Sequence, residues 1–189
     1  MSNEPRVFLR QPRAEDRDEF LAAVRRSRRL HHPWLLPPAT VERYDAFVRS
    51  LAQPSRASFV VCLRESGDLA GVVNLSEIVR GAFQSAYLSY YAFVPHAGRG
   101  LLSEGLRLFL RYAFRDLRLH RVEANIQPEN RASIALVARL GFRKEGYSPR
   151  YLKIGGRWRD HERWAVLRED WAAPSGDSSK LARRSAASS

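Results

Sequence analysis

The sequence predicts an α+β fold in which a central mixed sheet of about seven strands is flanked by about four helices. Two observations favour this class. Strand-like segments occur in pairs near both ends of the chain, and one strand–helix–strand unit lies between those pairs. Strands joined by a short turn pair antiparallel, whereas a strand–helix–strand unit connects parallel strands. The sheet is therefore expected to contain both kinds of pairing.

The first half of the chain is expected to form a strand, two helices and a hairpin. The two helices lie on either side of a loop bounded by prolines, residues 32–38. The hairpin turn is Ser66-Gly67-Asp68, between two segments in which apolar residues alternate. The expected bounds are 7–10 for the first strand, 15–29 and 40–52 for the helices, and 57–64 and 69–79 for the hairpin strands.

The middle of the chain joins a strand to an amphipathic helix through a glycine-rich turn. Residues 86–94 are aromatic and apolar with little strict alternation, which favours a central strand covered on both faces. The turn is Gly98-Arg99-Gly100, and the helix after it shows one buried stripe. That stripe consists of Leu102, Leu106, Phe109, Leu110, Ala113, Phe114 and Leu117.

This turn predicts a binding site for a phosphate-bearing cofactor. The first N–H groups of a helix are free, its dipole is positive at that end, and glycines let a backbone approach an anion closely. A Walker A loop ends in Gly-Lys-Ser/Thr, which the run from Gly98 to Ser103 lacks. The dinucleotide fingerprint also fails at Ser103, although Glu123 lies at roughly the distance of its ribose-binding acid. On this segment alone, glycines that merely shape a turn stay an open alternative.

The remaining elements are a strand, a short helix and a final hairpin. Asn130 is the expected N-cap of the helix, and Gly141 ends it. Gly155-Gly156 is the turn signal of the hairpin. The expected bounds are 121–126 for the strand, 132–140 for the helix, and 145–154 and 158–167 for the hairpin strands.

Two motifs in this region resemble those of a known family. The run PENRASIALVARLGFRKEGY, with Asn130, Ser133 and Gly141-Phe142, is similar to the second cofactor motif of the GNAT N-acetyltransferases. The run AGRGLL resembles their acetyl-CoA pyrophosphate loop, and the resemblance covers about residues 7–171. The segments VVRGAFQSAYLSY and YLKIGGRWRDHERWAVL extend it to the RimJ/RimL branch, which acetylates the N-termini of ribosomal proteins.

The resemblance implies a GNAT-like fold, acetyl-CoA as co-substrate and no metal. In that fold the strands expected at 86–94 and 121–126 splay apart, and acetyl-pantetheine fills the cleft, where it pairs with backbone as an added strand does. The pyrophosphate then lies on the glycine-rich turn. The implied cofactor-binding residues are Ala92, Phe93, Val94, Gly98, Arg99, Gly100, Leu101, Leu102, Ser103, Asn130 and Ser133.

The chain departs from the family pattern at several positions. The usual loop reads Gln/Arg-x-x-Gly-x-Gly/Ala, but Ala97 and Leu102 stand at its first and last positions, so no side-chain contact from position 97 is expected. Many members place a Tyr seven residues after the motif Asn to protonate the departing thiolate, and Val137 stands there. Ser133 resembles the Ser that takes this role in the RimL-like branch. A Glu suspected as base in that branch falls on Leu152, which leaves the general base open.

The implied reaction is direct acetyl transfer to the α-amine of a protein N-terminus, and the RimJ/RimL resemblance implies that of a ribosomal protein. Such an amine has an unperturbed pKa of about 7.7–8.0, against about 10.4 for lysine, so it attacks near neutral pH without a strong base. Glu77 and Asp160 are further catalytic or acceptor-binding candidates, although each also suits an ordinary surface carboxylate.

Two other functions stay open. The first is acetylation of a small amine such as an antibiotic or a polyamine. Polycationic acceptors favour an acidic site, and the chain offers few clustered carboxylates. The second is a non-catalytic module that associates with the ribosome or with RNA. The absence of the Tyr and of an assigned general base supports this alternative.

Composition predicts one acetyltransferase domain, residues 1–172, followed by a disordered basic tail, residues 173–189. No apolar signal core or membrane-length run occurs, so a cytoplasmic protein without membrane contact is expected. Cys62 is the only cysteine, which excludes an intramolecular disulfide, and the five histidines form no zinc ligand pattern.

The net charge is +12, with 29 arginines against 3 lysines. The run Arg25-Arg26-Ser27-Arg28-Arg29 concentrates this charge at the end of the first helix. It suits a polyanion such as ribosomal RNA, although a solvated helix face explains the same run.

Overall fold

The structure is a computed structural model that describes residues 4–171. Its seven strands form one sheet in the order β1-β2-β3-β4-β5-β7-β6. Within the described chain, β4 and β5 are parallel and the other neighbouring strands are antiparallel. This is the mixed sheet that the two hairpins and the strand–helix–strand unit predict. The expected tail, residues 173–189, lies outside the described residues.

The strand bounds follow the predicted ones within two residues. They are β1 (Val7–Arg10), β2 (Ala57–Leu63), β3 (Leu69–Val79), β4 (Ser85–Ala92), β5 (Arg121–Ile126), β6 (Arg143–Ile154) and β7 (Arg157–Leu167). The main helices are α3 (Val41–Ser50), α4 (Leu101–Arg115) and α5 (Arg131–Arg139).

The first predicted helix, 15–29, is divided in the structure. It consists of the 3-10 turn η1 (Ala14–Asp16), α1 (Arg17–Arg26) and α2 (Arg28–His31). The break falls at Ser27, which is fully buried and accepts a hydrogen bond at its Oγ from the backbone N–H of Val94, 2.9 Å away. A long-range contact therefore ends α1 where the local pattern continues.

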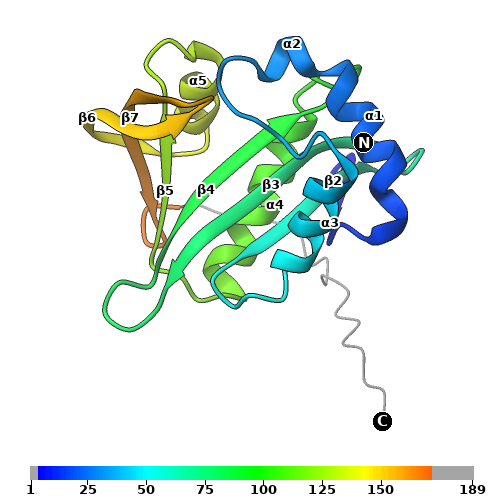
Figure 1. Ribbon diagram of the computed structural model, residues 1–189. Coiled ribbons are helices and arrows are strands. Elements are labelled where there is room, and N and C mark those ends of the chain that lie inside the picture. Colours follow the sequence, from blue (N-terminus) through cyan, green and yellow to red (C-terminus); the bar gives the residue numbers. More distant parts are fainter. Residues whose placement is uncertain (1–3, 172–189) are drawn as a thin grey trace.

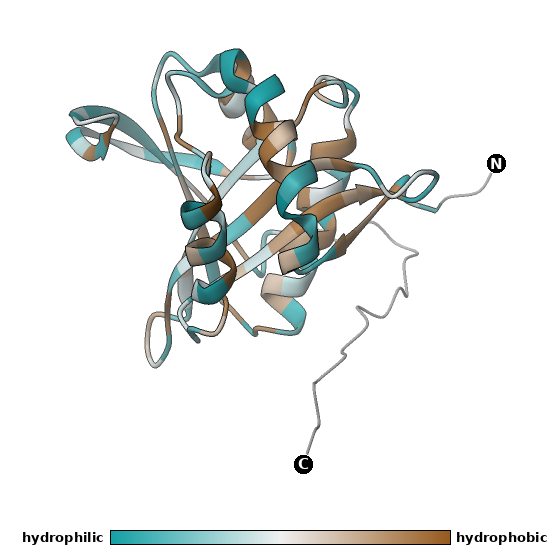
Figure 2. Cartoon of the chain, turned by 45° about the vertical axis from the view of Figure 1, so that its right-hand side comes forward, coloured by the Kyte–Doolittle hydropathy of each residue, from teal (hydrophilic) through white to brown (hydrophobic). Residues whose placement is uncertain are grey.

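Helices cover both faces of the sheet (Figure 1). One apolar cluster joins α4 and α5 to the sheet, and a second joins α1 and α3 to the opposite face. Figure 2 shows the hydrophobic colour concentrated on the central strands, with hydrophilic residues on the outer sides of the helices. Gly105 allows α4 to lie close to β2, because a Cβ at that position would come within 2.7 Å of Val61 Cγ2.

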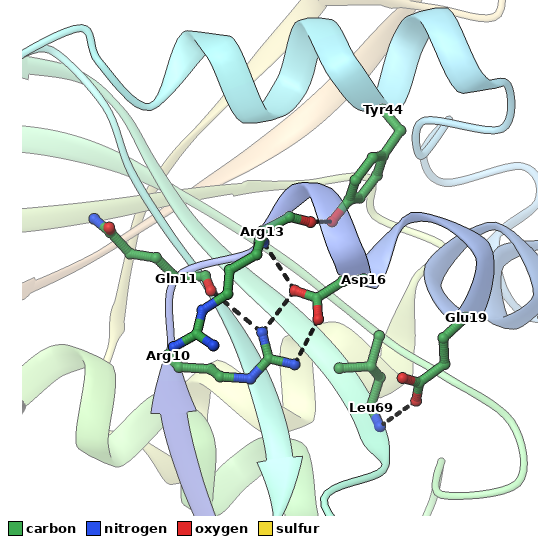
Figure 3. A network of polar contacts seen from close by, with 7 residues as sticks. All are labelled: Arg10, Gln11, Arg13, Asp16, Glu19, Tyr44 and Leu69. Atoms are coloured by element: carbon green, nitrogen blue, oxygen red, sulfur yellow. Dashed lines mark hydrogen bonds and ion pairs between the residues drawn. The ribbon is translucent and has the colours of Figure 1, made fainter.

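A polar network fixes the start of α1 against β1 (Figure 3). Arg10 donates to both carboxylate oxygens of Asp16, at 2.6 and 2.8 Å, and the Tyr44 hydroxyl donates to the carbonyl of Arg13 at 2.7 Å. Burial alone would raise the pKa of Asp16, but the hydrogen bonds from Arg10 and from the Arg13 backbone lower it overall. The network ties η1, α3 and β1 together.

The parallel strands pair over a short length only. The register joins Ser85 to Arg121, Ala86 to Val122 and Tyr87 to Glu123, and the pairing of β4 with β5 stops there. Strand β4 continues to Ala92 without β5 at its side. This is the splay that the family resemblance implies.

The expectation that this strand is covered on both faces is wrong. Tyr87 is 37% exposed and Ser89 is also exposed, whereas Ala86 and Leu88 are buried. One face of β4 therefore packs on the core, and the other is open near the splay.

Candidate active site

The glycine-rich turn at residues 98–103 has the geometry that an anion requires. Gly98 and Gly100 have φ values of 78° and 80°, in the left-handed region that glycine adopts without strain. Gly100 is the N-cap of α4, and no side chain caps that helix. The first N–H groups of α4 have no acceptor within the helix itself. They belong to Leu101, Leu102 and Ser103.

Arg6 holds this turn from outside. Its guanidinium donates to the carbonyl of Arg99 at 3.0 Å and to Glu104 Oε1 at 2.8 and 2.5 Å, and its backbone N–H donates to Glu104 Oε2 at 2.9 Å. A carboxylate in the first turn of a helix would repel a bound phosphate. The Arg6 charge offsets that of Glu104, so the helix terminus stays favourable for an anion.

The splay brings Ser133 of α5 against Tyr90 of β4. The Tyr90 hydroxyl lies 2.5 Å from Ser133 Oγ and 3.3 Å from the Ser133 carbonyl oxygen. Burial raises the pKa of Tyr90 to about 12, and the hydrogen bond to Ser133 offsets only part of this effect. Tyr90 therefore keeps its proton at neutral pH, and either hydroxyl can donate in the contact with Ser133.

Asn130 has the predicted N-cap position. Its side chain accepts a hydrogen bond from the Ser133 N–H at 3.1 Å. This contact fixes the first turn of α5 and so orients Ser133. Val137, at the position where many family members carry a Tyr, is fully buried.

The backbone after the splay is less free than expected. The N–H of Phe93 donates to Ala70 of β3, and the N–H of Val94 donates to Ser27. The Ala92 carbonyl accepts from Nε2 of the buried His31 at 2.8 Å. The family resemblance implies that the cofactor pairs with the backbone at residues 92–94. Three groups of this backbone are instead taken up by Ser27 between α1 and α2, by His31 of α2 and by β3.

Glu77 and Asp160 lie away from the Tyr90–Ser133 contact. Glu77 is exposed in a bulge of β3. The residues on either side of this bulge pair with Tyr87 and Ser85, in the part of β4 that still pairs with β5. Asp160 accepts hydrogen bonds from the Tyr147 hydroxyl and, at 2.7 Å, from the Arg150 N–H. These two contacts lower the pKa of the Asp160 carboxyl. They also support the irregular part of β6 at Arg150, which has a positive φ.

Two contributors were not predicted from the sequence. Tyr90 lies in no motif. Its neighbours Tyr87 and Tyr91 are chemically equivalent to it, and sequence alone does not show which face of the strand is open. The signal that identifies it is the alternation within β4, which points Tyr90 to the α5 side. Arg6 carried no signal, because its partners lie more than ninety residues away along the chain.

Other candidate chemistry is not supported by neighbouring groups. Burial raises the pKa of the Cys62 thiol to about 11, so it stays protonated in the core. Over residues 4–171, no three His, Cys, Asp or Glu side chains gather as a metal site would need. None of the helices described is long and apolar enough to cross a membrane.

Acetyl-CoA fits the residues present. The uncapped start of α4 and the two left-handed glycines suit its pyrophosphate, and the unpaired stretch of β4 offers a strand edge to the pantetheine chain. Ser133 of α5 contacts Tyr90 on that stretch of β4, where the thioester would follow.

Comparison with known proteins identifies the family. Residues 6–143 match the family described as Acetyltransferase (GNAT) domain. The chain is 36% identical over 129 residues to the probable N-acetyltransferase YjcK of Bacillus subtilis, an alignment covering 68% of this chain and 71% of that protein. It is 45% identical over 104 residues to the [ribosomal protein uS5]-alanine N-acetyltransferase of Escherichia coli, where it spans 55% of this chain and about half, 54%, of the relative.

Solved structures agree with this result. Mycobacterium smegmatis RimJ in complex with CoA-disulfide superposes with a TM-score of 0.79 at 28% identity, covering 86% of this chain and 82% of that one. A spermidine N-acetyltransferase from Vibrio cholerae in complex with CoA and spermine has a TM-score of 0.75 at 23% identity, covering 87% and 97%, which shows the fold alone. The predicted fold class and the predicted CoA co-substrate are confirmed, and the chain belongs to the GNAT acetyltransferase family.

Proposed function

We propose that this protein acetylates the α-amine of a protein N-terminus with acetyl-CoA as the donor, and that a ribosomal protein is the preferred acceptor. The observation that carries the chemistry is the Tyr90–Ser133 contact at the splay of β4 and β5. The similarity to the E. coli enzyme named for an alanine of ribosomal protein uS5 supports the choice of acceptor.

The residues divide the work between binding and proton transfer. The start of α4 would hold the pyrophosphate, Asn130 orients Ser133, and acetyl-CoA supplies an activated acetyl thioester. Either hydroxyl of the Tyr90–Ser133 contact can donate; with Tyr90 as the donor, the Ser133 proton is available to a departing thiolate. Glu77 and Asp160 stay candidates for acceptor contacts at the margins of the site.

No strong base is needed for an N-terminal amine. Near pH 8 about half of such amines are neutral, since their pKa is about 7.7–8.0. Loss of the ammonium proton to water therefore suffices before attack. A lysine acceptor, with a pKa of about 10.4, would need a base that removes its proton in the site.

The basic run at the α1–α2 junction is a candidate contact for ribosomal RNA. Arg25, Arg26, Arg28 and Arg29 are all exposed, and the described residues give them no ion pair. Binding through such side chains weakens as salt rises, because counterions are released from the RNA.

A polyamine acceptor is the second candidate. It is favoured by similarity to the spermidine N(1)-acetyltransferase of E. coli, 28% identical over 143 residues, or 74% of this chain and 75% of that one. The charges around the splay favour the α-amine instead, as described below.

The test compares initial rates on three acceptors. These are a peptide with a free N-terminal Ala and no lysine, an N-terminally blocked peptide with lysine, and spermidine. We expect the free N-terminus to give the highest kcat/KM. Acetylation of lysine or spermidine alone would refute the proposed acceptor, and no acetylation despite CoA binding would favour a non-catalytic module.

A further inference from the structure

Three polar side chains form a row across the open face of the sheet, at the level where β4 and β5 separate. Asn74 of β3 is the direct cross-strand neighbour of Ser89 of β4. Tyr87 of β4 pairs with Glu123 of β5. Ser89 and Asn125 each lie two residues further along these two strands. Because side chains two residues apart share a face, all three lie on the face opposite Tyr90. We call Asn74, Ser89 and Asn125 the amide row.

The amide row holds unused hydrogen-bond acceptors. The side-chain oxygens Oδ1 of Asn74 and Asn125 are buried and have no hydrogen-bond partner among the described residues. Asn74 Nδ2 donates to Ser89 Oγ at 3.3 Å, which orients the Asn74 amide. An unpaired buried acceptor costs free energy, so two of them in one row point to a donor that arrives with a ligand.

Contacts between elements bound the amide row along the strands. On one side, Tyr87 of β4 and Tyr151 of β6 are hydrogen-bonded, a contact that with burial raises the pKa of Tyr87 to about 12. On the other side, the segment after α2 reaches β5, where Gln127 Nε2 donates to the Trp34 carbonyl at 3.2 Å. Neighbouring elements therefore enclose the amide row from both sides.

The carboxylates of β5, β6 and β7 are already paired. Arg121 binds both Glu123, at 2.9 Å, and Glu145. Lys144 lies 2.6 Å from Glu162, and Asp160 accepts from the Tyr147 hydroxyl. Within these three strands no other Asp or Glu occurs. On β3 and β4, the exposed Glu77 is the one carboxylate. The described strands around the amide row are therefore polar but offer few free negative charges to a polycation.

We infer that the amide row is the subsite that receives the acceptor amine, with the Oδ1 atoms of Asn74 and Asn125 accepting from its N–H groups. The inference rests on the proposed function and names the groups that set its specificity. A thioester bound in the splay would be met by an amine on this face from the side opposite Tyr90 and Ser133.

Neutral acceptors suit an N-terminal amine for a physical reason. A carboxylate beside the amine would favour its charged form and raise its pKa, which lowers the fraction able to attack. Amide oxygens orient the amine with a much smaller effect of this kind. A site built on amides therefore accepts a single amine and has little attraction for spermidine.

The experiment measures binding of an Ala-initiated peptide to the protein–CoA complex by calorimetry, together with CoA affinity. Asn125→Leu and Asn74→Leu each remove one acceptor at similar volume. We expect each to weaken peptide binding by about 10- to 100-fold, the range of one hydrogen bond to a charged group. CoA affinity should stay unchanged. Gln53→Leu, which removes an exposed amide between α3 and β2, is the matched control and should bind the peptide as the parent does.

A nearly isosteric variant provides a second readout. Asn125→Asp should tighten spermidine binding and move the pH midpoint of kcat for the peptide upward, because the new carboxylate stabilises the ammonium of the bound peptide. A merely structural Asn125 would produce neither change.

The outcomes separate the two proposals. Acetylation of lysine or spermidine alone by the parent protein defeats the proposed function. Peptide binding that is unchanged in both leucine variants, with CoA binding intact, defeats the amide row and leaves the proposed function standing. A parent complex that binds no α-amine peptide defeats both.

Discussion

At the scale of single residues, the proposed chemistry rests on a pair of hydroxyl groups. Ser133 was identified from its motif, but a lone serine is a poor acid. Tyr90 supplies what it lacks, because burial keeps the phenol protonated while the 2.5 Å contact connects it to Ser133 Oγ. The motif position that carries a Tyr in many family members is a buried valine here, and we propose that Tyr90 of β4 supplies the second hydroxyl instead.

The first prediction concerns this pair. Ser133→Ala should lower kcat by about ten- to a thousandfold, as loss of a proton donor does, and Tyr90→Phe should lower it less. Acetyl-CoA affinity should change little in either variant. Steady-state kinetics with a free N-terminal peptide checks this, and an unchanged kcat in Ser133→Ala would assign that residue to helix capping alone.

The second prediction concerns the phosphate turn. Gly100→Val should raise the dissociation constant of acetyl-CoA by at least tenfold, because a β-branched residue is strained at a φ of 80° and blocks the backbone. Gly67→Val is the matched control, since Gly67 has a φ of 82° in a hairpin turn with open space around it. Both variants should lose stability, and equal cofactor binding by both would show that the turn is not the site.

At the scale of elements, local pattern predicted most of the fold. All seven strands were predicted within two residues, because alternation and Gly-containing turns are local signals. The division of the first helix at Ser27 was not predicted. Ser27 is held there by a hydrogen bond from the N–H of Val94, which lies far along the chain. The open face of β4 was missed for the same reason, because coverage depends on where other elements pack.

The third prediction tests the packing of α4 on β2. Gly105→Ala should lower the free energy of unfolding by about 1–3 kcal/mol, because the new methyl group would overlap Val61, whose nearest methyl would lie 2.7 Å away. Thermal and urea unfolding measure the change. Adding Val61→Ala should recover part of the loss, and the absence of any recovery would place the strain elsewhere.

The fourth prediction follows from the Arg10–Asp16 ion pair. Asp16→Asn should lower the free energy of unfolding by about 1–3 kcal/mol at neutral pH. The folded-state pKa of Asp16 is lowered, so its contribution is complete above the unfolded value of about 3.9 and disappears as pH falls through the folded value. Urea unfolding between pH 3 and 7 should therefore show the gap between parent and variant closing in acid. A gap that stays constant over this range would contradict the assignment.

At the scale of the whole molecule, the sheet creates one site with two sides. Pairing of β4 with β5 stops after three residue pairs, which opens a strand edge between α4 and α5 on one face and the amide row on the other. Sequence alone predicted the phosphate turn and Ser133 as site residues, since both lie in short motifs. It could not locate Tyr90, Arg6 or the amide row, because their meaning depends on register between strands distant in the chain.

The most direct test uses one peptide that carries both kinds of amine, a free N-terminal Ala and an internal lysine. Fragment mass spectrometry after incubation with isotopically labelled acetyl-CoA locates the transferred acetyl group. We expect the label on the α-nitrogen with the parent protein and a strongly reduced yield with Ser133→Ala. Label on the lysine side chain, or an equal yield at the α-nitrogen without Ser133, would contradict the proposed reaction.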